Sequence, residues 1–350
     1  MRRMPQSLWI ATLSIALPAP AFGNPTLERV NGDEARLTWT AQPIDIRLSD
    51  DPIYDEKDPV AQVRDRGPTG ATITYPAHRR SYVLLRTSEG GEYQVVAERS
   101  LPLEKGSNFR DLGGYLGADG KRVAWGRIYR SGALPMLSEN DYSYLGELEI
   151  NAIVDLRSID ERQVAPDLLD DRNGALYVSN DYPIAPLIEA ARRKGDGALY
   201  AGTEKRLTPQ LRSMFNLLLR DEGAVMFHCS AGQDRTGIAA ALILSALGVD
   251  RNTIFRDYHL STALRRPQYE MPEIDPSEFP DNIIVQIYAQ QRAEHGELKA
   301  EPLYTKDGQS HIVMFFDYLD QTYGGAEAYL ASELDIGPDE IERLRDLYLD

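Results

Sequence analysis

One segment, His228–Gly237, limits what this chain can fold into more than any other part of the sequence. It reads HCSAGQDRTG and lies between an apolar run, AVMF, and a second apolar run that ends at Gly248. These flanks predict a buried strand, a tight loop and a buried helix closed by glycine. In such a loop the backbone N–H groups point inward, and the helix adds the positive end of its dipole. The segment therefore predicts a binding site for an anion such as phosphate.

Two side chains of this segment suit phosphate chemistry. Cys229 begins the loop, where the same positive field favours the reactive thiolate form. Arg235 follows after five intervening residues, so the loop can curl until the guanidinium faces the sulfur. Arginine binds two phosphate oxygens in a fork that lysine cannot form. A buried core cysteine is the alternative, but it does not explain why Gly232, Asp234 and Gly237 cluster at the same junction.

From residue 104 onward the pattern alternates between strands and helices, which predicts an α/β domain with a central sheet flanked by helices. The run INAIVDLRS, residues 150–158, reads as a buried strand that ends in charged residues. Residues 207–223 predict a helix with Pro209 in its first turn. The C-terminal third of the chain reads as amphipathic helices.

Residues 24–103 read instead as short strands separated by turns. The runs are ARLTWT, IDIRLS, ATITYPA, SYVLLRT and EYQVVAERSL, with the turn-rich segments DDP, RGPTG and SEGG between them. They predict a small all-β sandwich, and their spacing resembles fibronectin type III or immunoglobulin-like modules. We expect a separate accessory domain with few contacts across the joint at 104–108. A chain that starts near Glu104 is then expected to keep its activity on small substrates.

Residues 1–23 read as a secretory signal peptide. Two arginines precede an apolar stretch at 8–17, and small residues lead to position 23. A buried first helix is the alternative, but Pro18 and Pro20 count against it. We expect an exported bacterial protein, periplasmic or secreted. An exported chain with a single cysteine has no internal disulfide, so Cys229 needs another reason to be present.

The net charge of -16 opposes general attraction to nucleic acid or to anionic membrane surfaces. A phosphate site must therefore create its own local positive field. Beyond the signal, no apolar run approaches the roughly 20 residues that a membrane helix needs, so we expect no stable membrane insertion.

The loop and several other motifs resemble a known enzyme family. His-Cys, five residues, Arg and then Ser or Thr is the signature of the protein tyrosine phosphatase superfamily. The chain is most similar to the atypical bacterial members with the loop HCxAGKDRTG. Further similar motifs are NFRDLGGY at 108–115, GRIYRSGAL at 126–134, VDLRSIDER at 154–162 and the YGGAEAYL region. The resemblance extends over residues 104–350, leaves the sandwich outside, and implies a cysteine-dependent phosphatase without a metal or other cofactor.

The resemblance implies a role for each residue of the loop. Cys229 attacks phosphorus and forms a phosphocysteine, while Arg235 holds the equatorial oxygens. Asp234 matches a proposed general acid, and a salt bridge with Arg235 or a helix N-cap is the alternative. Thr236 is expected to hydrogen-bond the cysteine sulfur. The residues expected to bind the phosphate are Ser230, Ala231, Gly232 and Gln233.

Other residues are weaker candidates for the site. Asp155, at the end of its strand, is either a second catalytic carboxylate or a structural partner of Arg157. Arg110 and Asp111 lie in a segment that the family places near the active site and are candidate substrate-binding residues, with a structural ion pair as the alternative. His228 is expected to organise the loop through hydrogen bonds.

Two further features concern the rim of the site. The segment EAARRKGDG, with Arg192, Arg193 and Lys194, lies where relatives carry a mobile helical cover. A solvated helix face is the alternative for this segment. Gln233 stands where the family loop usually has lysine, which removes a positive charge and argues against heavily charged inositol phosphates as substrates.

Other chemistries fit the sequence less well. Thiol-dependent arsenate reductases need further cysteines, and sulfurtransferase loops lack this spacing with a following Thr-Gly. A non-catalytic phosphoprotein binder would not need Cys229, Asp234 and Arg235 together. The five histidines form no recognisable ligand pair, so no metal is expected. The substrate stays open between a phosphorylated protein, on tyrosine or serine, and a small phosphate ester.

Overall fold

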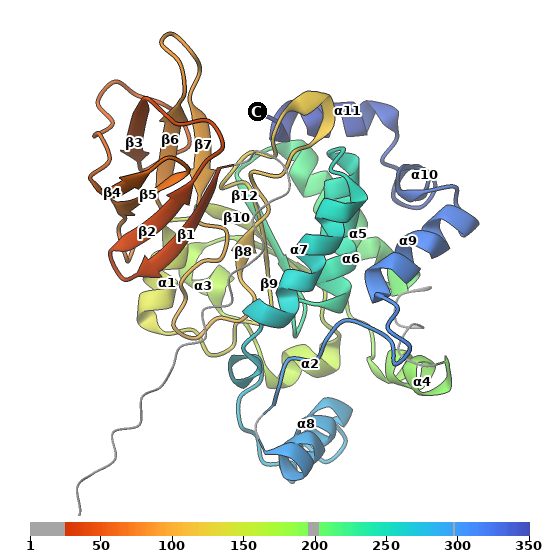
Figure 1. Ribbon diagram of the computed structural model, residues 1–350. Coiled ribbons are helices and arrows are strands. Elements are labelled where there is room, and N and C mark those ends of the chain that lie inside the picture. Colours follow the sequence, from red (N-terminus) through yellow and green to blue (C-terminus); the bar gives the residue numbers. More distant parts are fainter. Residues whose placement is uncertain (1–24, 195–202, 297) are drawn as a thin grey trace, which may run out of the picture.

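The computed structural model describes residues 25–194, 203–296 and 298–350 (Figure 1). It consists of an α/β unit with a central sheet between helices and, before it in the sequence, a two-sheet β-sandwich. The predicted fold class is therefore confirmed. The predicted signal peptide lies outside the described residues. Within them, every helix is too short or too polar to cross a membrane.

The central sheet of the α/β unit consists of β8 (Arg110–Asp111), β9 (Ile128–Ser131), β10 (Ile150–Asp155), β11 (Leu176–Ser179) and β12 (Ala224–His228). The strand order is β11-β10-β12-β9-β8. β9, β10, β11 and β12 are parallel, and β8 pairs with β9 in the antiparallel sense. Parallel strands are buried on both faces, which is why β10 and β12 are nearly continuous apolar runs.

The helices of the α/β unit are α1 (Glu139–Gly146), α2 (Ile159–Val164), α3 (Leu169–Asn173), α4 (Ala185–Lys194), α5 (Thr203–Arg220), α6 (Asp234–Ala246), α7 (Arg251–Leu264), α8 (Ile283–His295), α9 (His311–Thr322), α10 (Ala326–Leu334) and α11 (Pro338–Tyr348). Two of them begin earlier than predicted. α5 begins ahead of Pro209, which lies inside the helix. α6 begins at Asp234, within the segment 228–237 rather than after it, because a carboxylate is favourable in the first turn of a helix.

Helices cover both faces of the central sheet. On one face, Val154, Val225 and Phe227 pack with apolar residues of α5, α6 and the C-terminal helices. On the other face, Ile153 and Met226 pack with residues of α1 and α3. This alternation follows from the pleat, which turns successive side chains of a strand to opposite faces. Figure 1 shows α5, α6 and α7 side by side next to the strands.

The sandwich consists of β1 (Thr26–Asn31), β2 (Glu34–Thr38), β3 (Asp45–Ser49), β4 (Val63–Gly67), β5 (Gly70–Thr74), β6 (Tyr82–Arg86) and β7 (Gln94–Ala97). One sheet has the order β1-β2-β5-β4 and the other β3-β6-β7. This is the strand order of constant-type immunoglobulin sandwiches. Leu37, Ile73 and Val83 belong to the apolar core between the sheets. β1 and β4 were not among the predicted strands, because polar residues dominate their sequences.

Specific buried contacts cross the joint between the sandwich and the α/β unit. Arg80 of the sandwich donates a 2.6 Å hydrogen bond to the carboxylate of Asp111 in β8, and both side chains are buried. Tyr82 and Trp125 share one apolar cluster. The expectation that few contacts cross this joint stays a prediction, but these contacts show that the joint includes a buried ion pair. A chain that starts near Glu104 would leave Asp111 without this partner, so we expect such a chain to lose stability.

We expect Arg80→Met to lower the free energy of unfolding by about 3–5 kcal/mol, because the Asp111 carboxylate stays buried without its charged partner. The matched control is Arg79→Met, since Arg79 is adjacent in sequence, half-exposed and paired with Asp50 at the surface. That control should cost less than about 1 kcal/mol. Urea unfolding of both variants checks the prediction, and equal losses would show that this pair does not hold the joint.

Candidate active site

The carboxyl ends of the parallel strands meet at one edge of the central sheet. The register places Asp155 of β10 beside His228 of β12, and His228 beside Ser131 of β9. Ser179 at the end of β11 lies on the other side of Asp155. Ligands of open α/β sheets bind at this edge. The loop that begins with Cys229 follows His228 directly, so the sheet brings this loop to the expected place for a ligand.

The loop between β12 and α6 depends on one glycine. Gly232 has a φ of 66°, a conformation that favours glycine. A Cβ atom at this position would lie 2.5 Å from the carbonyl oxygen of Ser131 and 2.6 Å from the backbone nitrogen of Gly132. Only glycine therefore allows the loop to curl tightly against the end of β9.

The carbonyl groups of the loop are held on its outer side. The side-chain amide of Asn108 donates to the carbonyl oxygens of Ala231 at 3.1 Å and Gly232 at 2.8 Å. The backbone N–H of Ala133 donates to the carbonyl oxygen of Ser230 at 2.9 Å. In a trans peptide the N–H points opposite to the carbonyl, so the N–H groups that follow these carbonyls point into the loop. This arrangement suits an anion.

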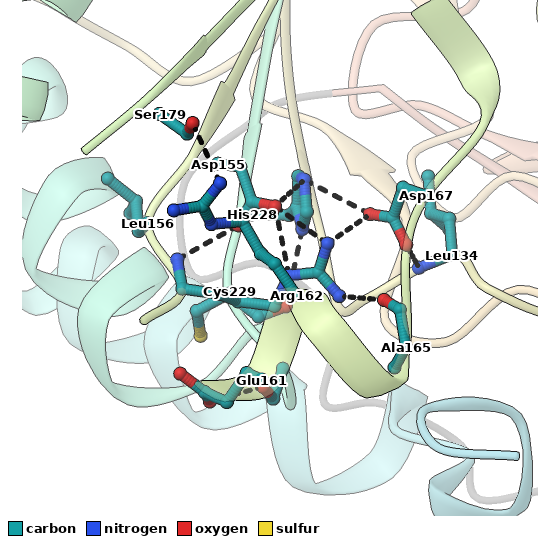
Figure 2. Close-up of polar contacts among 12 residues, drawn as sticks. Leu134, Asp155, Leu156, Glu161, Arg162, Ala165, Asp167, Ser179, His228 and Cys229 are labelled. Atoms are coloured by element: carbon teal, nitrogen blue, oxygen red, sulfur yellow. Dashed lines mark hydrogen bonds and ion pairs between the residues drawn. The ribbon is translucent and has the colours of Figure 1, made fainter. Parts of the chain in front are cut away.

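Cys229 stands at the start of the loop as a free thiol, with 2% of its surface exposed. Figure 2 shows its sulfur pointing toward the side on which Glu161 lies, away from His228. Thr236, in the first turn of α6, is buried, and no described residue forms a hydrogen bond with its hydroxyl. That hydroxyl is therefore available to the cysteine sulfur.

The guanidinium of Arg235 is held by one carboxylate in a bidentate pair. Its Nη1 donates to Glu161 at 2.7 Å, and its Nη2 donates to the other carboxylate oxygen at 2.6 Å. Nη1 also donates to the hydroxyl of Tyr182 at 2.9 Å and to the carbonyl oxygen of Leu156 at 3.3 Å. Among the described residues, none accepts a hydrogen bond from Nε. An arginine has five N–H donors, so Nε and the second hydrogen of Nη2 form a free edge that can bind two oxygens of an anion.

Glu161 was not among the predicted site residues, although it fixes Arg235. Burial alone would raise its pKa, but the charge of Arg235 lowers the pKa of Glu161 to about 2. The pair therefore stays ionised at any pH near neutrality. The hydroxyl of Ser230 donates to the same carboxylate at 2.5 Å and ties it to the loop. The sequence contained a signal, Ser158-x-x-Glu161, but this pattern is also an ordinary helix capping box.

Residues 101–350 match the model of the tyrosine phosphatase family. The chain belongs to this family. A protein of Cupriavidus necator, named provisionally as a tyrosine-protein phosphatase, is 32% identical over 187 residues, 50% of this chain and 67% of that protein. A tyrosine-protein phosphatase of Nostoc commune is 30% identical over 232 residues, 62% of this chain and 72% of that protein. The triple specificity protein phosphatase PtpB of Mycobacterium tuberculosis is 28% identical over 291 residues, 73% of this chain and 100% of that protein.

The predicted family is thus confirmed, and the protein is a phosphatase of the tyrosine phosphatase type.

Behind its loop lies a buried polar cluster around His228 (Figure 2). Nε2 of His228 lies 3.2 Å from Asp167, and Nδ1 lies 3.4 Å from the carbonyl oxygen of Cys229. Nη2 of Arg157 lies 2.6 Å from Asp155 and 3.3 Å from Asp167. These contacts fit a role for His228 in organising the loop.

This cluster contains the pair of Asp155 with Arg157 that the sequence left as the alternative, and a catalytic role for Asp155 stays a prediction. Asp155 is fully buried, pairs with Arg157 and accepts a 2.6 Å hydrogen bond from the hydroxyl of Tyr177. Burial would raise its pKa, but His228 and Arg157 hold the pKa of Asp155 below its usual range. Asp155, Asp167 and His228 place ligand atoms within 4.8 Å of one another. Arg157 already supplies the positive charge that a metal would bring there.

Arg110 and Asp111 lie in buried ion pairs, and their predicted role in substrate binding stays a prediction. Both side chains are fully buried. Arg110 pairs with Asp257 of α7 at 3.0 Å, and Asp111 pairs with Arg80 of the sandwich. The ion pairs that the sequence left as the alternative are therefore the observed arrangement. They anchor β8 on both sides.

Among the described residues, the cation that contacts Gln233 is Arg265, and its charge is paired. Gln233 is buried, and its amide oxygen accepts a 2.7 Å hydrogen bond from Nη1 of Arg265. Arg265 is in turn paired with Glu270 at 2.8 Å. The positive charge of the lysine that the family usually has at position 233 is thus not supplied here by an unpaired cation. The helical cover predicted at 189–197 falls partly outside the described residues and stays a prediction.

Proposed function

We propose that the chain hydrolyses phosphate monoesters through a phosphocysteine intermediate on Cys229. The free edge of Arg235 carries this proposal, because its Nε and Nη2 can bind two oxygens of one phosphate. The inward N–H groups of the loop can bind the remaining oxygens. A phosphate held in this way has its phosphorus next to the sulfur at the start of the loop.

The proposed reaction has two displacements at phosphorus. First, the thiolate of Cys229 forms an S–P bond while the P–O bond to the leaving group breaks. Arg235 and the loop N–H groups stabilise the charge on the equatorial oxygens. Water then attacks the phosphocysteine, the S–P bond breaks, and inorganic phosphate leaves with the thiolate restored. The hydroxyl of Thr236 stabilises the sulfur as the leaving group in this second step.

Asp234 gives the proton to the leaving oxygen in this proposal. It is the first residue of α6, directly before Arg235, and its side chain is partly exposed. In the second displacement its carboxylate takes a proton from the attacking water. Asp155 is a poorer candidate, because it is buried behind the loop in its pair with Arg157.

The proposed substrates are phosphoproteins, with phosphotyrosine as the principal target. The relative in Nostoc commune is named a tyrosine-protein phosphatase. At the rim, Gln233 is neutral and Arg265 is paired with Glu270. A neutral glutamine and a paired arginine beside the loop give little advantage to substrates that carry several phosphates. This favours a single phosphate ester over an inositol polyphosphate.

Hydrolysis assays in EDTA test the proposed function. We expect the purified chain to hydrolyse a phosphotyrosyl peptide and p-nitrophenyl phosphate without added metal, because the thiolate and the arginine carry out the chemistry. An inositol polyphosphate should be a poorer substrate than the peptide. Acid quenching of the reaction with a labelled peptide should trap phosphate on Cys229. Turnover that requires an added divalent metal would contradict the proposed mechanism.

In the same assay, Asp234→Asn separates the general acid from a structural aspartate. We expect kcat/KM to fall by about 100-fold or more on phosphotyrosine and much less on p-nitrophenyl phosphate, whose good leaving group hardly needs a proton. The alkaline limb of the pH profile should also flatten. Asp250→Asn is the matched control, since Asp250 caps the start of α7 away from the loop. Equal losses on both substrates would mean that Asp234 only positions Arg235.

A further inference from the structure

A second arginine lies behind the loop, outside the phosphate pocket. Arg130 of β9 stands beside Phe227 of β12 and is buried. Its Nη2 donates a 2.9 Å hydrogen bond to the carbonyl oxygen of Gly232, and its Nη1 donates at 2.6 Å to Asp257 of α7. Asn108 binds the same carbonyl oxygen at 2.8 Å. Arg130 and Asn108 together hold this carbonyl away from the anion site.

The charges in this buried cluster do not cancel. Asp257 also pairs with Arg110 at 3.0 Å, so one carboxylate serves two guanidinium groups. Burial and the nearby Arg110 lower the pKa of Arg130 to about 10, which still leaves it charged at neutral pH. Burial would raise the pKa of Asp257, but Arg110 and Arg130 hold it below its usual range. The cluster therefore carries one surplus positive charge.

The other partners of the cluster do not remove this surplus. Ser261 accepts a hydrogen bond from Arg110 at 3.0 Å, and the hydroxyl of Tyr115 donates to Asp257 at 3.0 Å. Both partners are neutral hydroxyls. Arg99, whose guanidinium lies 3.8 Å from the centre of the Tyr115 ring, adds a further positive charge nearby.

We infer that Arg130 is a positioning residue for the phosphatase reaction, which fixes the outward carbonyl of Gly232 and supplies a buried positive charge that favours the thiolate of Cys229. A buried charge is screened less than a surface charge, and the charge of Cys229 is one of the causes that raise the pKa of Arg130, so the two groups interact without a direct contact. The substrate is not contacted by this side chain. The inference rests on the proposed function of Cys229 as the nucleophile.

Other titratable groups face the loop, and two pairs among them are ion pairs. The groups are Glu161 of α2, Tyr182 ahead of α4, His228 of β12, Asp234 and Arg235 of α6, Arg265 after α7 and Tyr288 of α8. Behind His228, Asp155 and Asp167 share Arg157, and this cluster is the same in the wild type and in the variants of Arg130. Arg235 is matched by Glu161, and Arg265 is matched by Glu270. Because these pairs are close to neutral, the cluster of Arg130 makes a separate contribution to the field at the sulfur.

Alkylation of the single cysteine by iodoacetamide across pH tests the charge of Arg130. Only the thiolate reacts with iodoacetamide, and the measurement of alkylation requires no catalytic turnover. The result can therefore be interpreted even if the proposed phosphatase reaction does not occur. For Arg130→Gln we expect the midpoint pH of alkylation to rise by about one unit. Arg130→Lys keeps the charge and should leave the midpoint near that of the wild type. Arg80→Met, which removes an equally buried and paired arginine away from the loop, should not move it.

Steady-state kinetics test the geometry that Arg130 imposes. We expect Arg130→Lys to lower kcat on p-nitrophenyl phosphate by about 10-fold with a smaller change in KM, because one amine cannot bind Gly232 and Asp257 as the guanidinium does.

If Arg130→Gln fails to fold, Asp257→Asn gives an alkylation test of opposite sign, since it increases the buried positive charge and must lower the midpoint pH of alkylation. An unchanged midpoint in Arg130→Gln, an equal rise in Arg130→Lys, or a raised midpoint in Asp257→Asn would overturn the inference.

Discussion

Cys229→Ser is expected to lose turnover while it keeps its anion site. We expect kcat to fall by about 10,000-fold or more, the scale seen when a covalent nucleophile is removed. A serine hydroxyl stays protonated near neutral pH and is a much weaker nucleophile than a thiolate. The free edge of Arg235 and the inward N–H groups of the loop are unchanged. Vanadate should therefore bind the variant almost as tightly as it binds the wild type.

Both measurements are needed to interpret the serine variant. Titration of vanadate by calorimetry shows whether the loop still holds an anion, and a phosphotyrosyl peptide assay shows whether chemistry remains. Because the chain has a single cysteine, no second thiol can replace Cys229. Undiminished hydrolysis by the variant would remove Cys229 as the nucleophile. Loss of both turnover and vanadate binding would show instead that the sulfur shapes the loop.

The tight loop between β12 and α6 could be predicted because its residues are adjacent in the sequence. Cys229, Gly232 and Arg235 lie in one turn from β12 to α6, so their spacing alone defines their arrangement. The buried strands and the long helices could be predicted for a similar reason, since each is a continuous apolar or periodic run. The sequence pattern was sufficient to predict those parts of the structure that are formed by residues close together in the chain.

The partners of the loop could not be predicted in this way, because they come from distant segments. Glu161 lies 74 residues from Arg235, and Asp257 lies 127 residues from Arg130. No local pattern shows which buried carboxylate faces which arginine. The sequence did contain a weaker signal for Arg130. This arginine lies in β9, a strand whose residues are all buried. A charge in such a place needs a specific partner.

The joint with the sandwich shows the same limit of sequence reasoning. Arg79 and Arg80 are neighbours in a polar segment, and nothing in the sequence separates their roles. In the structure Arg79 is exposed, whereas Arg80 is 5% exposed and paired with Asp111. Only the packing of the sandwich against β8 distinguishes them. The sandwich therefore completes a buried ion pair of the catalytic unit, which strand spacing alone could not indicate.

Arg235→Lys is the second variant with a large expected effect. We expect kcat/KM on a phosphotyrosyl peptide to fall by about 1,000-fold or more, the scale at which a phosphate-binding arginine contributes to phosphoryl transfer. The guanidinium uses both Nη atoms for Glu161 and still has Nε and one Nη2 hydrogen for phosphate. A lysine has only three donors on one nitrogen, so it cannot hold Glu161 and form a fork at the same time.

The vanadate affinity of Arg235→Lys distinguishes it from Cys229→Ser, because the fork holds the anion before the reaction as well as during it. Arg235→Lys should therefore weaken vanadate binding strongly. The matched control is Arg265→Lys, since Arg265 also pairs with a buried carboxylate beside the loop, and its expected loss is less than about 10-fold. Wild-type vanadate affinity in Arg235→Lys would mean that the loop N–H groups alone bind the ground-state anion. Comparable losses in both lysine variants would show that a nearby positive charge matters and that the bidentate edge does not.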